Sequence, residues 1–295
     1  MPKFAANIST MFTEWDFLDR LDAAAEAGFR AVECQSLYAV SAEALAARLS
    51  ATGLTLALFN LPAGDWEAGE RGLAALPDRF EAFRDGVARG LDYALATKTT
   101  RLHMMAGLAE RGDAAAERAY RHSLGYAAER LGAAGIEVMI EPINPRSMPG
   151  YFLADFDDAL AHIEASGRSN VRLQFDVFHR QILDGDIVTG FRRLLPVIGH
   201  VQIASVPSRN EPDGEELNYA YLFAQFDRLG DRGHVGGGRI EIHRPNRVAD
   251  DLALLSHRNM VLVIFPPDRP FRLVAAGVDE ILGQVRVFLL SGRLR

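Results

Sequence analysis

The segment from residue 136 to residue 178 begins with the apolar run IEVMIEPI (136–143) and ends with a second run, VRLQFDVF (171–178). Both runs are nearly continuous in apolar residues, which is typical of strands buried on both faces in a parallel sheet. The residues between them show helical periodicity. A strand, a helix and a second strand in this order predict one β-α-β unit of a parallel sheet.

The same unit repeats along the chain. Six more apolar runs, each followed by a helical pattern, are KFAANIS (3–9), AVEC (31–34), LTLALFN (54–60), RLHMMAG (101–107), HVQIASV (200–206) and GRIEIHRP (238–245). Thr13 is a candidate N-cap for the first helix. Eight alternating strands and helices favour closure into a (β/α)8 TIM barrel over an open, doubly wound sheet. The open alternative also lacks the expected G-x-G-x-x-G signature after the first strand.

The chain is predicted to divide near residue 258. Residues 246–258 can form the eighth helix, so residues 1–258 would make the barrel and residues 259–295 a C-terminal extension. The extension contains the stretch VDEILGQVRVFLL (278–290). As a helix, this stretch would carry on one face Ile281, Leu282, Val285 and Leu289. That face needs burial against the barrel or a second subunit, so a homo-oligomer is one expectation.

Composition and charge exclude several classes of partner. The formal net charge is −7 without a dense Lys/Arg cluster, so the field of the protein would repel a nucleic-acid backbone. No apolar run reaches the roughly 18 residues that a membrane span requires, and residues 1–15 lack the pattern of a signal peptide. We expect neither a nucleic-acid nor a membrane partner. Cys34 is the only cysteine, which fits a reducing cytoplasm.

Polar side chains lie at or near the C-terminal end of each run. They are Asn7, Glu33, Asn60, His103, Glu141, Asp176, His179, Gln202 and Glu241. The catalytic groups of a barrel gather at this end of its strands. Carboxylate, amide and imidazole groups are ligands that divalent cations accept. The sequence therefore predicts a candidate metal site at the mouth of the barrel.

Two carboxylates and a histidine stand out among these residues. Glu141 follows the apolar run VMI, so its carboxylate would leave water unless a cation or hydrogen-bond donors received it. A structural ion pair with a barrel arginine is the alternative. The same argument, with the same alternative, applies to the carboxylate of Asp176 within QFDVFH. His179 lies three residues later and could either bind substrate or be a satisfied surface histidine.

Gln202 and Arg209 belong to the seventh repeat. A buried Gln202 amide needs partners for both its oxygen and its nitrogen, and metal ligation would use the oxygen. Arg209 carries the planar fork that binds a carboxylate through two hydrogen bonds, although an exposed ion pair with Glu211 fits the spacing equally well. Three further groups are expected to line the site: Asn7, Asn60 and His103. For the two asparagines, capping of the strand ends is the alternative role.

Four long motifs make a family resemblance visible. They are NLPAGDWEAGERG (60–72), EPINPRSMPGYFL (141–153), FDVFH (175–179) and GHVQIASVPSRNEPDGEELNYAYLF (199–223). Together they resemble the hydroxypyruvate isomerase family, including its 2-oxo-tetronate isomerase branch, from about residue 1 to about residue 230. The resemblance implies a xylose-isomerase-like barrel. It also implies an aldehyde–ketone isomerisation of a small hydroxy-keto acid through an enediolate.

The resemblance further implies roles for individual residues. The ligands of a divalent metal, Mg²⁺ or Mn²⁺, would be Glu141, Asp176, Gln202 and a glutamate from the eighth strand, for which this chain offers Glu241. Glu141 and Glu241 would be the catalytic acid–base pair. Residues expected on the substrate side are His179, Arg209, His103 and Asn7.

The chain departs from the family pattern in two places. After the second strand it has ECQSLY (33–38) where the family has roughly Glu-Phe-x-Phe-Pro-Tyr. Near the end it has GGGRIEIHRPN (236–246), and matching its Arg-Pro pair to the family's basic-Pro pair puts Ile242 at the ligand position. A slip of one residue turns a strand side chain to the other face. The glycines at 236–238 make a compensating bulge easy, so we expect Glu241 to face the mouth.

Three other functions share this fold. A ketose 3-epimerase would use the same carboxylate pair on a substrate with a different number of carbons. A metal-dependent nuclease would need a basic surface, which the charge of −7 opposes. A barrel that only binds a sugar acid would result if Glu241 did not reach the metal.

Overall fold

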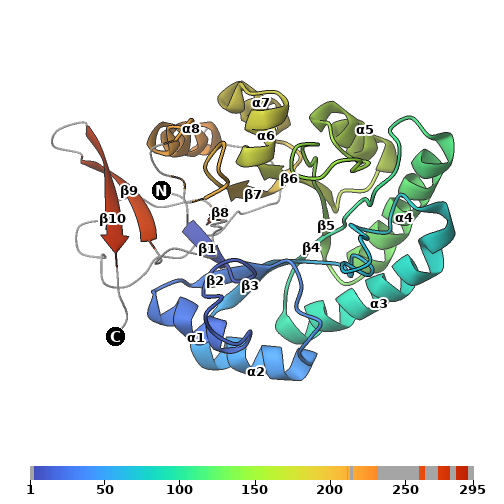
Figure 1. Ribbon diagram of the computed structural model, residues 1–295, viewed down its shortest axis with the longest axis horizontal. Helices are drawn as coiled ribbons and strands as arrows, with labels where there is room; N and C mark the ends of the chain where they lie inside the picture. The colour runs from blue at the N-terminus through green and yellow to red at the C-terminus, as the bar shows by residue number, and fades with distance from the viewer. Residues whose placement is uncertain are drawn as a thin grey trace.

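A computed structural model describes residues 3–210, 212, 215–231, 259–262, 272–279 and 284–291. Figure 1 shows helices around a central ring of strands. Consecutive strands pair in parallel, and β8 pairs with both β7 and β1, which closes the barrel. The strands are β1 (Lys3–Asn7), β2 (Ala31–Cys34), β3 (Thr55–Asn60), β4 (Arg101–His103), β5 (Glu137–Ile140), β6 (Val171–Asp176), β7 (Ile198–Ile203) and β8 (Asn259–Leu262).

Helices follow the strands and cover the outside of the barrel (Figure 1). They are α1 (Asp19–Glu26), α2 (Ala42–Thr52), the 3-10 helix η1 (Pro77–Arg79), α3 (Phe80–Thr97), α4 (Ala114–Gly132), α5 (Phe156–Ser166), α6 (Val177–Leu183), α7 (Ile187–Leu194) and α8 (Tyr219–Asp231). Asp113 and Asp155 cap α4 and α5 by accepting main-chain N–H bonds, as short polar residues do at helix starts. The prediction of Thr13 as N-cap was wrong, because several turns separate β1 from α1, which begins after Leu18 without a side-chain cap.

The core lies between the strands and the helices. Phe175 of β6 is fully buried, and its ring centroid lies 5.5 Å from that of Phe156 and 5.4 Å from that of Phe191. Phe191 in turn stacks on Phe226 of α8 at 3.9 Å. Burying each such ring contributes about 1.5–3 kcal/mol. The aromatic contacts therefore fix α5, α7 and α8 against β6 and hold the C-terminal end of that strand in place.

The first seven strands coincide with the predicted runs, and the eighth does not. β8 is Asn259–Leu262, whereas the sequence predicted the eighth strand over residues 238–245. Residues 238–258, including the predicted eighth helix, lie outside the described residues. Two short apolar runs compete for this place, and periodicity alone does not distinguish them. The run NMVL carries no charged residue, which suits a strand buried on both faces better than GRIEIHRP does.

The segment predicted as an extension contributes to the barrel and to a hairpin. β8 begins at its first residue, so the barrel continues beyond residue 258. β9 (Arg272–Asp279) and β10 (Gln284–Ser291) form an antiparallel pair outside the ring of strands (Figure 1). The helix predicted over residues 278–290 was therefore wrong. That stretch contains QVRVFLL (284–290), in which valines at 285 and 287 alternate with other residues, a pattern that favours a strand. No helix in the described ranges is long and apolar enough to span a membrane.

Candidate active site

A pocket of about 1040 Å³ lies at the C-terminal ends of the strands. Residues from the ends of several strands and from the loops that follow line it together. Among them are Asn7, Asn60, His103, Glu141, His179, Gln202 and Arg209. The structure therefore brings these seven predicted site residues into one cavity. Glu241 lies outside the described residues, so its direction stays a prediction, and the observed β8 has no carboxylate in its sequence NMVL.

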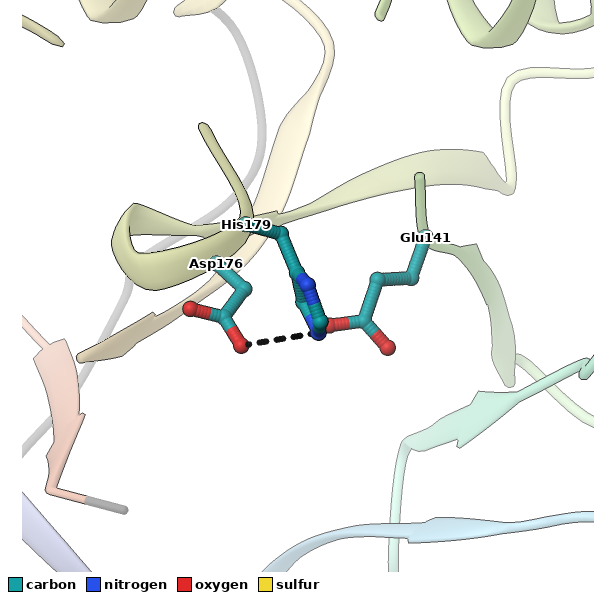
Figure 2. Close-up of side chains that lie close together, drawn as sticks. All are labelled: Glu141, Asp176 and His179. Carbon is teal, nitrogen blue, oxygen red and sulfur yellow. Dashed lines mark ion pairs between the residues drawn. The ribbon is translucent and has the colours of Figure 1, made fainter. Parts of the chain in front are cut away.

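Two acidic residues and a histidine lie close together at the ends of β5 and β6, and two of them, Glu141 and His179, line the pocket (Figure 2). One ligand atom from each of Glu141, Asp176 and His179 lies within 4.8 Å of the others. His179 Nε2 is 3.5 Å from Asp176 Oδ2, the contact drawn in Figure 2. Asp176 ends β6, and its Oδ1 caps α6 by accepting the Phe178 N–H at 2.7 Å. This cap turns the chain so that His179, in the first turn of α6, faces the pocket beside Asp176.

The two carboxyl groups lie close together in this buried cluster. Burial, followed by the nearby Asp176, raises the pKa of Glu141 to about 8. Burial also raises the pKa of Asp176. Glu141 Oε1 is buried without a hydrogen-bond partner among the described residues. Buried carboxylates that lack donors are expected to bind a cation. Two carboxylates beside an imidazole are a donor set that suits a divalent metal, so the residues present fit such an ion.

Two histidines flank Glu141 as neutral groups. Burial, followed by the charge of His200, lowers the pKa of His103 to about 3. Burial, followed by Arg209, lowers the pKa of His179 well below its usual value. His103 Nδ1 lies 3.2 Å from Asn60 Oδ1, and its Nε2 lies 3.7 Å from Glu141 Oε2. Both rings therefore act in the site as neutral hydrogen-bonding groups.

The carboxylate of Glu33 lies beside the pocket and receives three donors. Its Oε1 accepts from Asn7 Nδ2 at 2.9 Å and from Gln202 Nε2 at 2.8 Å, and its Oε2 lies 2.8 Å from His200 Nε2. A carboxylate only accepts hydrogen bonds, so the Gln202 amide must present its nitrogen to Glu33. Its oxygen then faces the other way and accepts from Gln174 Nε2 at 2.9 Å. This network fixes the direction of the Gln202 oxygen, the atom that a metal would use.

Sequence reasoning missed Gln174 and Asn144. Gln174 lies two residues before Asp176 on β6, and the two-residue period of a strand puts both on the same face. That spacing could have identified Gln174. Asn144 lies in the loop after β5 and contacts His179, which no local sequence signal reveals.

Arg209 reaches the same cluster from the loop after β7. Its Nη2 is 3.6 Å from Asp176 Oδ2 and 3.2 Å from His179 Nε2, and its guanidinium lies 4.8 Å from the Phe178 ring centroid. The backbone φ of Arg209 is +59°, which is uncommon outside glycine and asparagine. Non-glycine residues in this conformation cluster at functional sites. The alternative partner, Glu211, lies outside the described residues.

Three further arginines line the outer part of the pocket, and sequence reasoning did not single them out. Arg20 donates to the Ile8 carbonyl at 2.8 Å, Arg71 to the Trp66 carbonyl at 2.9 Å, and Arg89 to the Tyr38 carbonyl at 2.9 Å. All three arginines line the cavity. Carbonyl partners orient a guanidinium without neutralising its charge, so the wall of the pocket is positively charged.

Comparison with known proteins identifies the family. The model of the xylose isomerase-like TIM barrel family matches residues 21–256. The 2-oxo-tetronate isomerase of Cupriavidus necator is 51% identical over 238 residues, which cover 80% of this chain and 92% of the relative. The hydroxypyruvate isomerase of Escherichia coli is 40% identical with the same two shares of coverage.

A solved structure agrees over nearly the whole chain. The structure of a family 2 AP endonuclease from Brucella melitensis superimposes with a TM-score of 0.80 at 41% identity. The match covers 91% of this chain and 95% of that one. The chain therefore belongs to the xylose isomerase-like TIM-barrel family and, within it, to the hydroxypyruvate isomerase family, whose members are enzymes of the isomerase class.

Proposed function

We propose that this isomerase interconverts hydroxypyruvate and 2-hydroxy-3-oxopropanoate, or a 2-oxo-tetronate analogue, through an enediolate. The observation that carries the proposal is Glu141, a buried carboxyl group that lines the pocket with Asp176 and His179 beside it. A carboxylate in this position can act as the general base toward a substrate in the pocket. The names of the relatives from C. necator and E. coli support the substrate class.

A divalent cation, Mg²⁺ or Mn²⁺, is part of the proposal. Glu141, Asp176 and the oxygen of Gln202 would hold it, with Glu241 as the fourth ligand. When bound, such an ion supplies positive charge that stabilises the negative charge on two adjacent substrate oxygens. Glu141 Oε1, which has no hydrogen-bond partner within the described part of the chain, and the orientation of the Gln202 amide support this assignment.

The proton on carbon is moved by the carboxylates. Glu141 removes it from one carbon, and Glu141 or Glu241 returns it to the neighbouring carbon. Arg209 offers two parallel N–H groups to the substrate carboxylate, and His179, His103 and Asn7 bind its oxygens. The loop at residues 60–72, which borders the pocket through Gly64 and Trp66, would exclude water from the enediolate.

The positively charged wall of the pocket fits an acid as substrate. The protein carries a net charge of −7, which by itself would repel an organic anion. The arginines at positions 20, 71, 89 and 209 reverse that sign locally. Clefts lined by one sign of charge concentrate ligands of the opposite sign. An acidic substrate is therefore better suited to this pocket than a neutral ketose.

Solvent deuterium incorporation tests the proposed reaction. In D₂O with Mg²⁺ or Mn²⁺ supplied, we expect deuterium to enter hydroxypyruvate or a 2-oxo-tetronate at carbon, because the enediolate exchanges its carbon-bound proton. Proton NMR of the recovered acid measures the exchange. The substrate that exchanges faster identifies the preferred number of carbons. Absence of exchange in both acids would contradict the isomerase mechanism.

Metal binding is expected to depend on pH. The pKa of Glu141 in the folded, metal-free protein is about 8, above its ordinary value of 4.5. Protonation of Glu141 therefore contributes to the stability of the metal-free protein. This contribution is fully present below pH 4.5 and is lost as the pH rises through 8. A cation reverses the loss because it binds the ionised carboxylates. The rise in Tm on adding Mn²⁺ should therefore be larger at pH 8.5 than at pH 6, and an equal rise at both would argue against Glu141 as a ligand.

Two further predictions concern the cellular location and the oligomeric state of the enzyme. Cys34 is buried and unpaired, as a reducing compartment would leave it, so a cytoplasmic location is part of the proposal. A homo-oligomer likewise stays a prediction, and light scattering of the full chain would measure it.

A further inference from the structure

Asn144 supplies two hydrogen-bond donors to one nitrogen of His179. Its main-chain N–H points at His179 Nδ1 over 3.2 Å, and its side-chain Nδ2 lies 2.7 Å from the same atom. Asn144 is fully buried, in the loop that follows β5. The contact therefore joins the β5 loop, which carries Glu141, to the first turn of α6.

The direction of the Asn144 amide is fixed independently of the histidine. Its Oδ1 accepts the main-chain N–H of Ser147 at 2.9 Å. The amide nitrogen must then face His179, because the oxygen is held on the other side. The main-chain N–H of Asn144 can only donate. Both groups at His179 Nδ1 are thus donors, so this nitrogen must be the acceptor and carries no proton.

We infer that Asn144 is a positioning residue that holds His179 in the tautomer with its proton on Nε2. The inference deepens the proposed function and rests on it only for the role of His179 toward substrate. Nε2 faces the centre of the site, 3.5 Å from Asp176 Oδ2. In this tautomer Nε2 has no free lone pair. His179 is then a hydrogen-bond donor beside the metal site rather than a metal ligand, although it lies within 4.8 Å of Glu141 and Asp176.

A donor at this place suits the chemistry of the pocket. Arg209 Nη2, a second donor, lies 3.2 Å from His179 Nε2, which places one donor at Nε2 against the two at Nδ1. Nδ1 therefore remains the acceptor, and Asp176 Oδ2, 3.5 Å from Nε2 and 3.6 Å from Nη2, can accept from both groups. An oxygen that gains negative charge as the enediolate forms would receive hydrogen bonds from both groups. Preorganised donors of this kind stabilise developing charge without reorganising during the reaction. The opposite tautomer would present a lone pair to that oxygen and repel it.

Imidazole nitrogen NMR of the full chain tests the tautomer directly. Metal-free protein labelled with ¹⁵N-histidine is used, and the His179 signals are assigned by their loss in His179→Gln. We expect Nδ1 of His179 to resonate in the unprotonated range and Nε2 in the protonated range. A protonated Nδ1 in the unmutated chain would overturn the inference. This result does not depend on any activity, so failure of the proposed function and failure of the inference are distinguishable.

Asn144→Asp should reverse the tautomer. Aspartate has nearly the same shape but can only accept, so His179 Nδ1 should take up a proton and its signal should move to the protonated range. We expect kcat to fall about 10–100-fold, as for the loss of groups that orient a catalytic side chain. An unprotonated Nδ1 in this folded variant, or a fall in kcat without a change of tautomer, would show a structural role only.

Asn170→Asp is the matched control. Asn170 Nδ2 donates to the carbonyls of Ala128 and Ile136 just before β6, at the opposite end of that strand from the pocket. The substitution removes the same donor group from a partly buried asparagine. We expect the His179 signals and kcat to stay unchanged in this variant. If Asn144→Asp does not fold, Asn144→Ala removes only the Nδ2 donor, and its Nδ1 signal should still shift toward weaker hydrogen bonding. No shift would overturn the role of Asn144.

Discussion

Glu141→Gln is expected to lower kcat by about 10²–10⁴-fold, the usual contribution of a general base. Glutamine keeps the volume of the side chain but cannot accept the carbon-bound proton. It also weakens a proposed metal ligand. The exchange assay in D₂O and steady-state kinetics with saturating metal measure the loss.

The fold of Glu141→Gln should persist. Burial disfavours the ionised form of Glu141 and raises its pKa to about 8, so an uncharged amide removes an unfavourable charge at higher pH. Glu137→Gln is the control, because Glu137 begins β5, the strand that Glu141 follows, and pairs at that opposite end of the strand with Arg101 at 3.4 Å. We expect its kcat to match that of the unmutated enzyme. Retention of most activity in Glu141→Gln would place the base elsewhere.

Glu33→Gln is expected to destabilise the protein and to weaken metal binding together. A glutamine at position 33 brings an NH₂ group to a site where Asn7, Gln202 and His200 now face a carboxylate. At least one donor is left without an acceptor, which costs about 1–3 kcal/mol of unfolding free energy. The Gln202 amide also loses the partner that orients it, so metal affinity should fall about 10–100-fold. Urea unfolding and a Mn²⁺ titration measure the two effects.

An exposed glutamate provides the comparison for Glu33→Gln. Glu129 is paired with Arg168 at 3.2 Å on the surface, with a side chain that is 71% exposed. Glu129→Gln should change stability by less than about 1 kcal/mol and leave metal affinity unchanged. If Glu33→Gln behaves like Glu129→Gln in both measurements, the network around Glu33 does not orient the site.

The local pattern of apolar and polar residues was sufficient to predict most strands of the barrel. Seven strands are near-continuous apolar runs, and the polar residues at or near the ends of most of them line the pocket, because parallel strands share their C-terminal edge. The eighth strand was misplaced because NMVL and GRIEIHRP are both short apolar runs after a helix. Choosing between them depends on which run pairs with β1, a contact across the whole chain that local periodicity does not encode.

The arrangement within the site was harder to predict. Strand position alone placed Glu141, Asp176 and Gln202 at the same end of the barrel, but did not predict the partners that orient them. Glu33 reaches Gln202 across 169 residues of sequence, and Asn144 reaches His179 across 35. Such contacts follow from the closure of the barrel and from the loop after β5. These contacts can be identified only from the three-dimensional arrangement of the strands.

The size of the pocket bears on which molecules the enzyme would convert in a cell. A cavity of about 1040 Å³ has room for roughly 35 water molecules at about 30 Å³ each, far more than a three-carbon acid displaces. One methylene group distinguishes substrates by only about 1–3 kcal/mol even in a close-fitting apolar pocket, and a wide, hydrated one distinguishes less. The enzyme would then be a generalist among short hydroxy-keto acids. Which acid it consumes would be decided by their relative concentrations more than by the shape of the cavity.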